Sequence, residues 1–210
     1  LAALQSEGGY LVNADEKAKL LAVMWDDHGR RTLDTVAREA RVIAERAGFS
    51  LPDGKTFIIV EEDKIGKAHK FSSEKLSPVL AIFRYDGFDT LLTLVAEIFE
   101  VGGKGHSVGI ASFDDDHIHR LAMMAPVSRI MVRQPNVSGN AGSFTNGMPM
   151  TASLGCGTWG GNVTSENISV KHYMNTTWVS RTIPEDRPSE QELLREFYNS
   201  ATFDDLQVDG

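Results

Sequence analysis

A glycine-rich segment in the second half of the chain has the spacing of a nucleotide-binding turn. Residues 155–160 read Gly-Cys-Gly-Thr-Trp-Gly, which matches the G-x-G-x-x-G pattern of dinucleotide sites. Such a site follows an apolar strand, opens a helix and has an acidic ribose ligand about 20 positions later. Here residues 150–153 read Met-Thr-Ala-Ser, and residues 167–183 contain no acidic side chain. We therefore interpret these glycines as a turn built for close backbone packing.

Cys156, the single cysteine of the chain, is the next candidate for chemistry. A cysteine acts as a nucleophile where a neighbouring base or cation stabilises its thiolate. No histidine or lysine lies near it in sequence, and the sequence leaves open whether one approaches it in space. We interpret Cys156 as a packed small residue, and it has no partner for an internal disulfide.

Two histidines and three aspartates between residues 114 and 119 resemble a metal site. His117 and His119 are separated by one residue, so on a helix their side chains point away from each other. Asp114, Asp115 and Asp116 fit better as negative charges at the start of that helix, where the helix dipole favours them. The sequence therefore predicts no metal ion here.

His106 and Glu74 each stand at a junction between predicted elements. Residues 102–105, Gly-Gly-Lys-Gly, lack the spacing of a phosphate-binding loop and are typical of a helix end and turn. His106 is expected to begin a buried strand, where it either faces a ligand crevice or is a hydrogen-bonded core residue. Glu74 lies four residues before Pro78, which introduces another strand. It is either a solvated loop residue or an acceptor for ribose hydroxyls.

The elements that must position these residues alternate along the chain. Helices are expected after Asn13 or Asp15, over 33–47, 88–101 and 114–124, and strands over 55–60, 79–83, 106–112 and 129–132. Strands separated by helices favour parallel pairing with helices on both faces. We predict an α/β fold, a three-layer αβα domain with a mostly parallel sheet.

Three segments fall outside this alternation. Residues 135–162, rich in Gly, Asn, Ser and Thr, form a long loop of the kind that carries function or an interface. Residues 173–183 are predicted as one extended strand without an internal partner, hence a candidate for pairing with another chain. A capping box at Ser189–Glu192 predicts a last helix through Phe197. The first residues look like the last turns of a helix that ends at Gly8-Gly9, and we expect the chain to be a fragment.

Composition limits the partners of the protein. The 210 residues carry 21 Lys and Arg against 29 Asp and Glu, a net charge of -8. With a pI near 5.2 and no basic stripe, nucleic acid is not expected as a partner. No apolar run is long enough to cross a bilayer, and a single cysteine requires no oxidising compartment. We therefore predict a soluble, cytoplasmic protein without a membrane partner.

Read together, four segments resemble the aldehyde dehydrogenase superfamily. Phe71–Leu80 looks like its E-x-x-x-P-V segment, and Gly102–Ser107 resembles its G-G-x-G-H-[ST] stretch. Leu154–Asn162, which reads L-G-C-G-T-W-G-G-N, is followed by Ser-Glu-Asn at 165–167 and Lys-His at 171–172. This order is similar to the CoA-acylating branch, which includes the aldehyde dehydrogenase half of bifunctional aldehyde-alcohol dehydrogenases. The resemblance covers roughly residues 8 to 181.

The resemblance implies a catalytic domain without its cofactor-binding domain. It places the nucleophilic cysteine upstream of Leu1, so no catalytic residue is expected in this chain and the fragment alone is expected to be inactive. Cys156 falls on a structural cysteine of the family. The implied organisation is a catalytic domain over 1–172, an oligomerisation strand over 173–183 and a tail with one helix over 184–210. Through that strand the protein is expected to form homo-oligomers.

The same resemblance implies the cofactor-binding residues, which are Glu74, Leu76 and His106. Glu74 falls on the glutamate that hydrogen-bonds the nicotinamide ribose. Leu76 stands where most non-acylating relatives carry Phe, and its smaller side chain leaves room for CoA exchange. The implied cofactor is NAD or NADP, with coenzyme A as co-substrate and a small aldehyde as substrate. The implied reaction is thiolate attack on the aldehyde, hydride transfer to the cofactor, and transfer of the thioester to CoA. A non-acylating enzyme that gives the carboxylic acid, and a non-catalytic binding module, are the alternatives.

Overall fold

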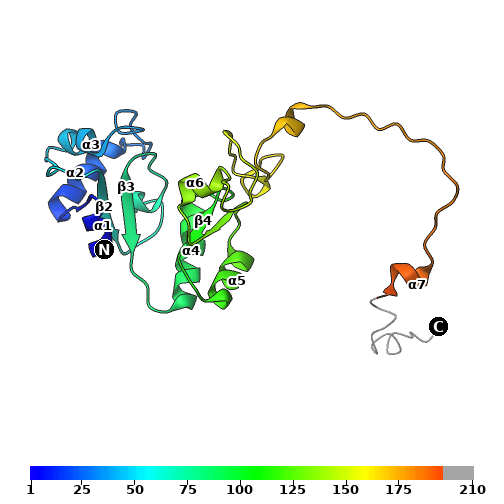
Figure 1. Cartoon of the computed structure of the whole chain (residues 1–210). Coiled ribbons are helices and arrows are strands. Elements are labelled where there is room, and N and C mark those ends of the chain that lie inside the picture. Colours follow the sequence, from blue (N-terminus) through cyan, green and yellow to red (C-terminus); the bar gives the residue numbers. More distant parts are fainter. Residues whose placement is uncertain (196–210) are drawn as a thin grey trace. The chain divides into compact units, whose positions relative to one another are not determined.

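The first half of the chain is built on a parallel sheet with helices packed against it (Figure 1). The computed structural model describes residues 1–195. The elements of this half are α1 (Ala2–Ser6), β1 (Gly9–Leu11), α2 (Ala14–Met24), α3 (Ala40–Arg46), β2 (Phe57–Glu62), the 3-10 helix η1 (Lys70–Ser72) and β3 (Val79–Phe83). The strand order is β1-β2-β3, with Tyr10 opposite Ile58 and Ile59 opposite Leu80. The sheet thus places β3, and the loop that leads into it, at one edge.

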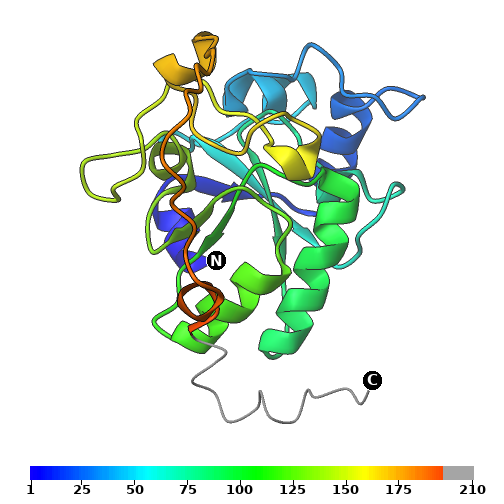
Figure 2. The same cartoon turned by 90° about the vertical axis from the view of Figure 1, so that its right-hand side faces the viewer.

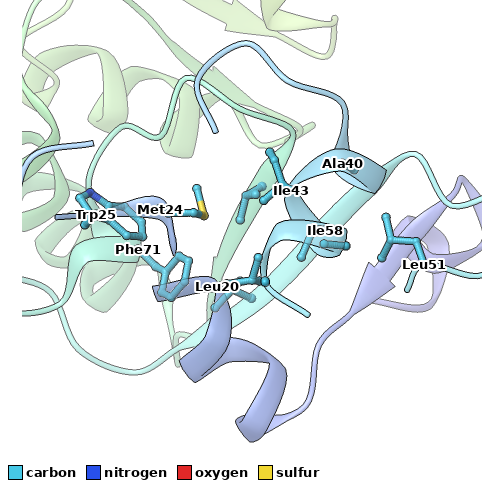
Figure 3. Packing of buried hydrophobic residues seen from close by; sticks show 12 residues of the cluster. Leu20, Met24, Trp25, Ala40, Ile43, Leu51, Ile58 and Phe71 are labelled. Carbon is cyan, nitrogen blue, oxygen red and sulfur yellow. The ribbon is translucent and has the colours of Figure 1, made fainter. Parts of the chain in front are cut away.

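The main hydrophobic core lies between this sheet and helices α2 and α3. Leu20 of α2, Ile43 of α3 and Ile58 of β2 are fully buried and lie close together (Figure 3). Phe71 of η1 joins them, and its ring meets that of Trp25 edge-on at a centroid distance of 5.1 Å. Residue Phe71 therefore ties the loop that follows it to the core.

A second, separate sheet follows. Its elements are α4 (Phe88–Gly102), β4 (Val108–Ile110), α5 (Asp115–Met124) and β5 (Ile130–Val132). Strands β4 and β5 are parallel, with Gly109 opposite Met131. Helices α4 and α5 run next to each other (Figure 1, Figure 2). They pack on these strands through α4 side chains including Leu92 and Val95 and through Leu121 of α5.

The α/β class and the parallel pairing agree with the sequence, but the strands form two sheets instead of the single sheet expected. The apolar face of α4 packs on the core of β4 and β5, which is separate from the core of the first sheet. Nothing among residues 1–195 continues the ladder from β3 to β4.

The predicted helix over 33–47 is too long. Helix α3 begins at Ala40, and residues 33–39 form turns. Ala37 has a φ of +54°, outside the helical region, and its N–H donates to the carbonyl of Leu76 at 2.8 Å. A tertiary hydrogen bond therefore replaces the first turns that the apolar spacing predicted.

Several short elements were not predicted from the sequence. Strand β1 has three residues, and α6 (Asn136–Asn140) lies within the predicted long loop. Two further 3-10 helices, η2 (Thr158–Gly160) and η3 (Val170–Tyr173), interrupt the remaining loops. Periodicity needs more residues than these elements contain.

The chain divides into a unit over Leu1–His172 and a second unit that begins at Tyr173. Within the second unit, residues 174–183 belong to no sheet, so the predicted strand is not formed in the single chain. A strand needs a partner for its backbone groups, and residues 1–195 supply none here. Helix α7 (Glu190–Leu193) starts with the predicted capping box of Ser189 and Glu192, while its predicted continuation through Phe197 lies outside the described residues.

Across residues 1–195, every helix is too short or too polar to cross a lipid bilayer.

Candidate functional site

Glu74 lies in the loop between η1 and β3, where a cation holds it. Arg31 Nη1 donates to the Glu74 backbone carbonyl at 2.6 Å and lies 3.2 Å from its carboxylate Oε2. The Glu74 side chain nevertheless stays 61% exposed. An ionised carboxylate only accepts hydrogen bonds, and each oxygen accepts more than one. Glu74 is therefore a fixed acceptor with capacity left for hydroxyl donors.

Leu76, two residues later, has a backbone conformation that is unusual for leucine. Its φ is +49°, its side chain is among the exposed large hydrophobic ones at 48%, and its carbonyl accepts the Ala37 N–H. A left-handed conformation at a non-glycine residue costs about 1–2 kcal/mol, so surrounding contacts must maintain it. Two left-handed residues joined by a hydrogen bond thus fix the loop against residues 31–37. The sequence carried no signal for Arg31 or Ala37 as supports.

A hollow lies beside this loop. It is lined by backbone and side chains of three parts of the chain: residues 71–75, Ala81 and Phe83 of β3, and Ile98, Phe99, Gly102 and Gly103 at the end of α4. Lys75 lies within it and donates from Nζ to the carbonyls of Phe71 at 2.9 Å and Ser73 at 2.8 Å. Burial lowers the pKa of Lys75. Two segments named by the sequence, Glu74 and the Gly-Gly pair, therefore line one hollow.

His106 is not among the residues that line this hollow, and its predicted position was wrong. It does not begin a buried strand, because β4 starts at Val108 and the His106 side chain is exposed. Its Nδ1 lies 2.9 Å from the Ser107 hydroxyl, which also accepts a hydrogen bond from Asn140 Nδ2 at 2.9 Å. The other ring nitrogen of His106, Nε2, makes no hydrogen bond or ion pair among residues 1–195.

The glycine-rich segment serves backbone contact. A Cβ on Gly105 would lie 1.9 Å from the carbonyl oxygen of Cys156, and one on Gly157 would lie 1.8 Å from the Ser128 hydroxyl oxygen. A Cβ on Gly160 would lie 2.3 Å from the Cβ of Cys156. The segment leads only into the three-residue 3-10 helix η2, whereas a dinucleotide turn leads into an α-helix whose N-terminus binds the pyrophosphate. Cys156 itself is exposed, so its interpretation as a packed small residue was wrong.

A buried arginine joins the glycine-rich segment to the Ser-Glu-Asn segment. Arg129 is 4% exposed and donates from Nε to Asn167 Oδ1 at 2.8 Å and from Nη1 to the Gly155 carbonyl at 3.2 Å. Asn167 in turn donates to the carbonyls of Asn140 at 3.0 Å and Pro149 at 2.7 Å. Burial lowers the pKa of Arg129. The sequence carries no local signal for the role of Arg129, because its partners lie about 26 and 38 residues away.

The end of this region is an ion-pair cluster. Glu166 pairs with Lys171, and its Oε2 lies 3.2 Å from His172 Nε2. His172 Nδ1 accepts the Ser169 N–H at 2.9 Å, so the ring orientation is set from both nitrogens. The ammonium group of Lys171 lowers the pKa of Glu166. The Lys-His pair of the sequence therefore anchors the Ser-Glu-Asn segment.

The aspartates and histidines at the start of α5 cap the helix and pack against neighbouring side chains. The Asp114 carboxylate accepts the N–H groups of Asp116 at 2.9 Å and His117 at 3.3 Å. The His117 ring stacks on Phe88 with centroids 3.8 Å apart. In the described part of the chain, no three His, Cys, Asp or Glu side chains are grouped as a metal site would require.

Comparison with known proteins extends along most of the chain. No family model matches it. It is 39% identical over 194 residues to the sulfoacetaldehyde dehydrogenase of an Acholeplasma species, which is 90% of this chain and 40% of that protein. It is 36% identical over 202 residues to the sulfoacetaldehyde dehydrogenase (acylating) of Bilophila wadsworthia, which is 94% of this chain and 44% of that protein.

The fold of this chain is also similar to that of a solved structure. The crystal structure of an acetylating aldehyde dehydrogenase from Geobacillus thermoglucosidasius matches with a TM-score of 0.78 and 34% sequence identity. The match covers 88% of this chain and 41% of that chain. This chain therefore spans about 40% of the length of the relatives that it matches.

Proposed function

This chain belongs to the acylating aldehyde dehydrogenase family, and we propose that it is part of an enzyme that oxidises a small aldehyde to its acyl-CoA thioester. The proposed cofactor is NAD or NADP, and coenzyme A is the proposed co-substrate. The observation that carries the proposal within the chain is the exposed, arginine-held carboxylate of Glu74 in a segment of the family type.

Glu74 is the proposed contact to the ribose next to the nicotinamide. Its carboxylate accepts hydrogen bonds only, which suits the two hydroxyl donors of a ribose. Arg31 fixes the backbone and one oxygen of Glu74, so little side-chain freedom is lost on binding. When bound, the cofactor supplies the hydride acceptor for the reaction.

Leu76 and His106 are the other proposed cofactor residues. Leu76 is exposed and shorter than the Phe of non-acylating relatives, which leaves space for CoA exchange. His106 presents an exposed ring whose Nδ1 is engaged by Ser107. These two residues lie at different segments of the chain, so we propose separate contacts for them.

We assign no nucleophile to this chain. Cys156 lies where its backbone carbonyl packs against Gly105 and its Cβ against Gly160, and this contact suits a structural residue. In the described residues it has no hydrogen-bonded His or Lys that could activate its thiol. The proposed reaction therefore needs a thiol from another part of the enzyme, and this chain alone is expected to be inactive.

The experiment that tests the proposal measures hydride transfer in the intact enzyme with and without CoA. CoA-dependent formation of NADH or NADPH from a panel of aldehydes, including sulfoacetaldehyde and propionaldehyde, supports the acylating reaction. Oxidation that needs no CoA and gives the carboxylic acid would favour a non-acylating enzyme. Absence of oxidation with every aldehyde of the panel would favour a binding module.

Glu74→Gln tests the cofactor contact. This change keeps the size of the side chain but loses the charge-assisted hydrogen bonds. Misplacement of a reacting group by about 1 Å can cost on the order of a hundredfold in rate, while the adenine half still anchors the cofactor. We therefore expect kcat for hydride transfer to fall more than cofactor affinity. Glu61→Gln, which removes an exposed carboxylate paired with Arg84, is the matched control.

We also propose that residues 173–183 form an oligomerisation strand. Tyr173, Trp178 and Val179 are 81%, 92% and 81% exposed, and this segment pairs with no strand among residues 1–195. Exposed apolar side chains on an unpaired segment favour pairing with a second copy. Light scattering of the intact enzyme tests this: Trp178→Asp is expected to lower the mass, and an unchanged mass would contradict the proposal.

A further inference from the structure

A pocket opens where the second parallel sheet ends. Strands β4 and β5 are parallel. The pocket is lined by the last two residues of β4, Gly109 and Ile110, and by residues that follow the two strands, namely Ala111, Phe113, Arg133, Gln134 and Pro135. Ligands of α/β sheets bind at the carboxyl ends of the strands. The pocket is therefore in the usual position for a small ligand.

Arg133 is the charged side chain of this pocket. Its φ is +51°, and its N–H donates to the Ile110 carbonyl at 2.8 Å, so a hydrogen bond ties the end of β5 to the end of β4. Its guanidinium donates from Nη1 to the Ser112 carbonyl at 2.6 Å and lies 4.8 Å from the centroid of the Phe113 ring. These contacts hold the guanidinium plane in place.

No carboxylate neutralises Arg133 within the described residues. Most surface arginines of this chain, such as Arg41 and Arg46, form ion pairs, whereas none of the ion pairs in residues 1–195 includes Arg133. Two of the three nearest aspartates in sequence are engaged elsewhere, since Asp114 caps α5 and Asp116 contacts Arg120, and Asp115 forms no ion pair with Arg133 in the described residues. A guanidinium has five N–H donors, and four of those on Arg133 remain without a protein partner in the described residues.

From this arrangement we propose that Arg133 binds the anionic head group, a sulfonate or carboxylate, of a short aldehyde substrate. A guanidinium matches two oxygens of such a group with two parallel hydrogen bonds. Gly109, Ala111 and Pro135 leave room for a short carbon chain and offer no competing charge. This inference rests on the proposed function and names the substrate class of the same enzyme.

The test compares two aldehydes of similar size, sulfoacetaldehyde and propionaldehyde, in the intact enzyme. Arg133→Met is expected to lower the ratio of their kcat/KM values by about tenfold to a hundredfold, since hydrogen bonds to charged groups contribute that much. Arg133→Lys keeps the charge without the bidentate geometry and is expected to recover part of the ratio. The matched control is Arg38→Met, which removes another exposed arginine that forms no ion pair in the described residues.

A second readout needs no turnover. Ethanesulfonate is expected to inhibit competitively with the aldehyde, and its inhibition constant is expected to rise at least tenfold in Arg133→Met. A ratio unchanged by Arg133→Met in an enzyme that oxidises both aldehydes would overturn this inference and leave the proposed function standing. An effect on the KM of CoA or of the cofactor, without a change in the ratio, would overturn it as well. Failure of the wild-type enzyme to oxidise any aldehyde would instead count against the proposed function.

Discussion

Arg129 offers a direct test of how the glycine-rich and Ser-Glu-Asn segments are held together. Its buried guanidinium reaches Asn167 at 2.8 Å and Gly155 at 3.2 Å, with longer contacts of 3.4 Å to the carbonyls of Ser165 and Glu166. Arg129→Met fills similar space but removes every donor. The acceptors it leaves are partly or wholly buried, where water replaces a donor poorly.

The expected loss follows from these contacts. A hydrogen bond to a charged group contributes about 1.5–3 kcal/mol, and contacts of 3.4 Å are near the limit of a hydrogen bond. Counting the two shorter bonds, we expect Arg129→Met to lower the free energy of unfolding by about 3–6 kcal/mol. Arg129→Lys offers one point donor to diverging acceptors and is expected to recover less than half of this loss.

Urea denaturation of the intact protein, followed by tryptophan fluorescence, measures this effect. Trp159 lies in η2 within the glycine-rich segment and contributes to the signal together with Trp25 and Trp178. The control is Arg84→Met, which breaks an exposed ion pair with Glu61 and is expected to cost less than about 1 kcal/mol. If Arg129→Met costs no more than Arg84→Met, the buried arginine does not hold these segments, and the reasoning fails.

Three further predictions concern the same region. Gly105→Ala is expected to destabilise the protein far more than Gly161→Ala in thermal unfolding. Both glycines have a positive φ, but only a Cβ on Gly105 would meet backbone, at 1.9 Å from the Cys156 carbonyl oxygen. Equal losses of stability would contradict this. Cys156→Ala is expected to leave the burst of acyl-enzyme in the intact enzyme nearly unchanged, and loss of the burst in a folded variant would contradict its structural role. Because Lys171 lowers the pKa of Glu166, their interaction stabilises the fold above the usual glutamate pKa of 4.5 and is lost as pH falls through the lowered pKa. The stability difference between wild type and Glu166→Gln is thus expected to shrink on acidification, and a difference that is constant with pH would show that no such linkage exists.

The sequence predicted the long elements and the family, and missed the supports of the site. Helix α5 begins after Asp114 as expected, because that side chain caps the helix and acts locally. Arg31 and Ala37 hold the Glu74 loop through contacts about 40 residues away in sequence, and local patterns carry no information about such contacts.

Contacts between distant segments also explain why two elements differ from their predictions. His106 was expected in a strand because apolar residues follow it, yet the ladder of β4 begins only at Val108, where its partner Ile130 begins. The predicted helix over 33–47 failed because the hydrogen bond from Ala37 to Leu76 outweighs helical propensity. The role of the glycines, in contrast, was predicted correctly. The sequence lacks the strand, helix and acidic residue that a dinucleotide turn requires, so close backbone packing was the remaining reason for glycine at these positions.

The two separate cores have a consequence for how the protein folds. The second core draws on residues between Phe88 and Ile130, whereas the first joins Tyr10 to Val79 across longer stretches of chain. Bringing together residues that are close in sequence costs less chain entropy, so the second core is expected to form early. It also contains fewer fully buried side chains, so its amide protons are expected to exchange with solvent sooner than those of β2. In this protein, the region that forms first is then expected to be the one that opens most often.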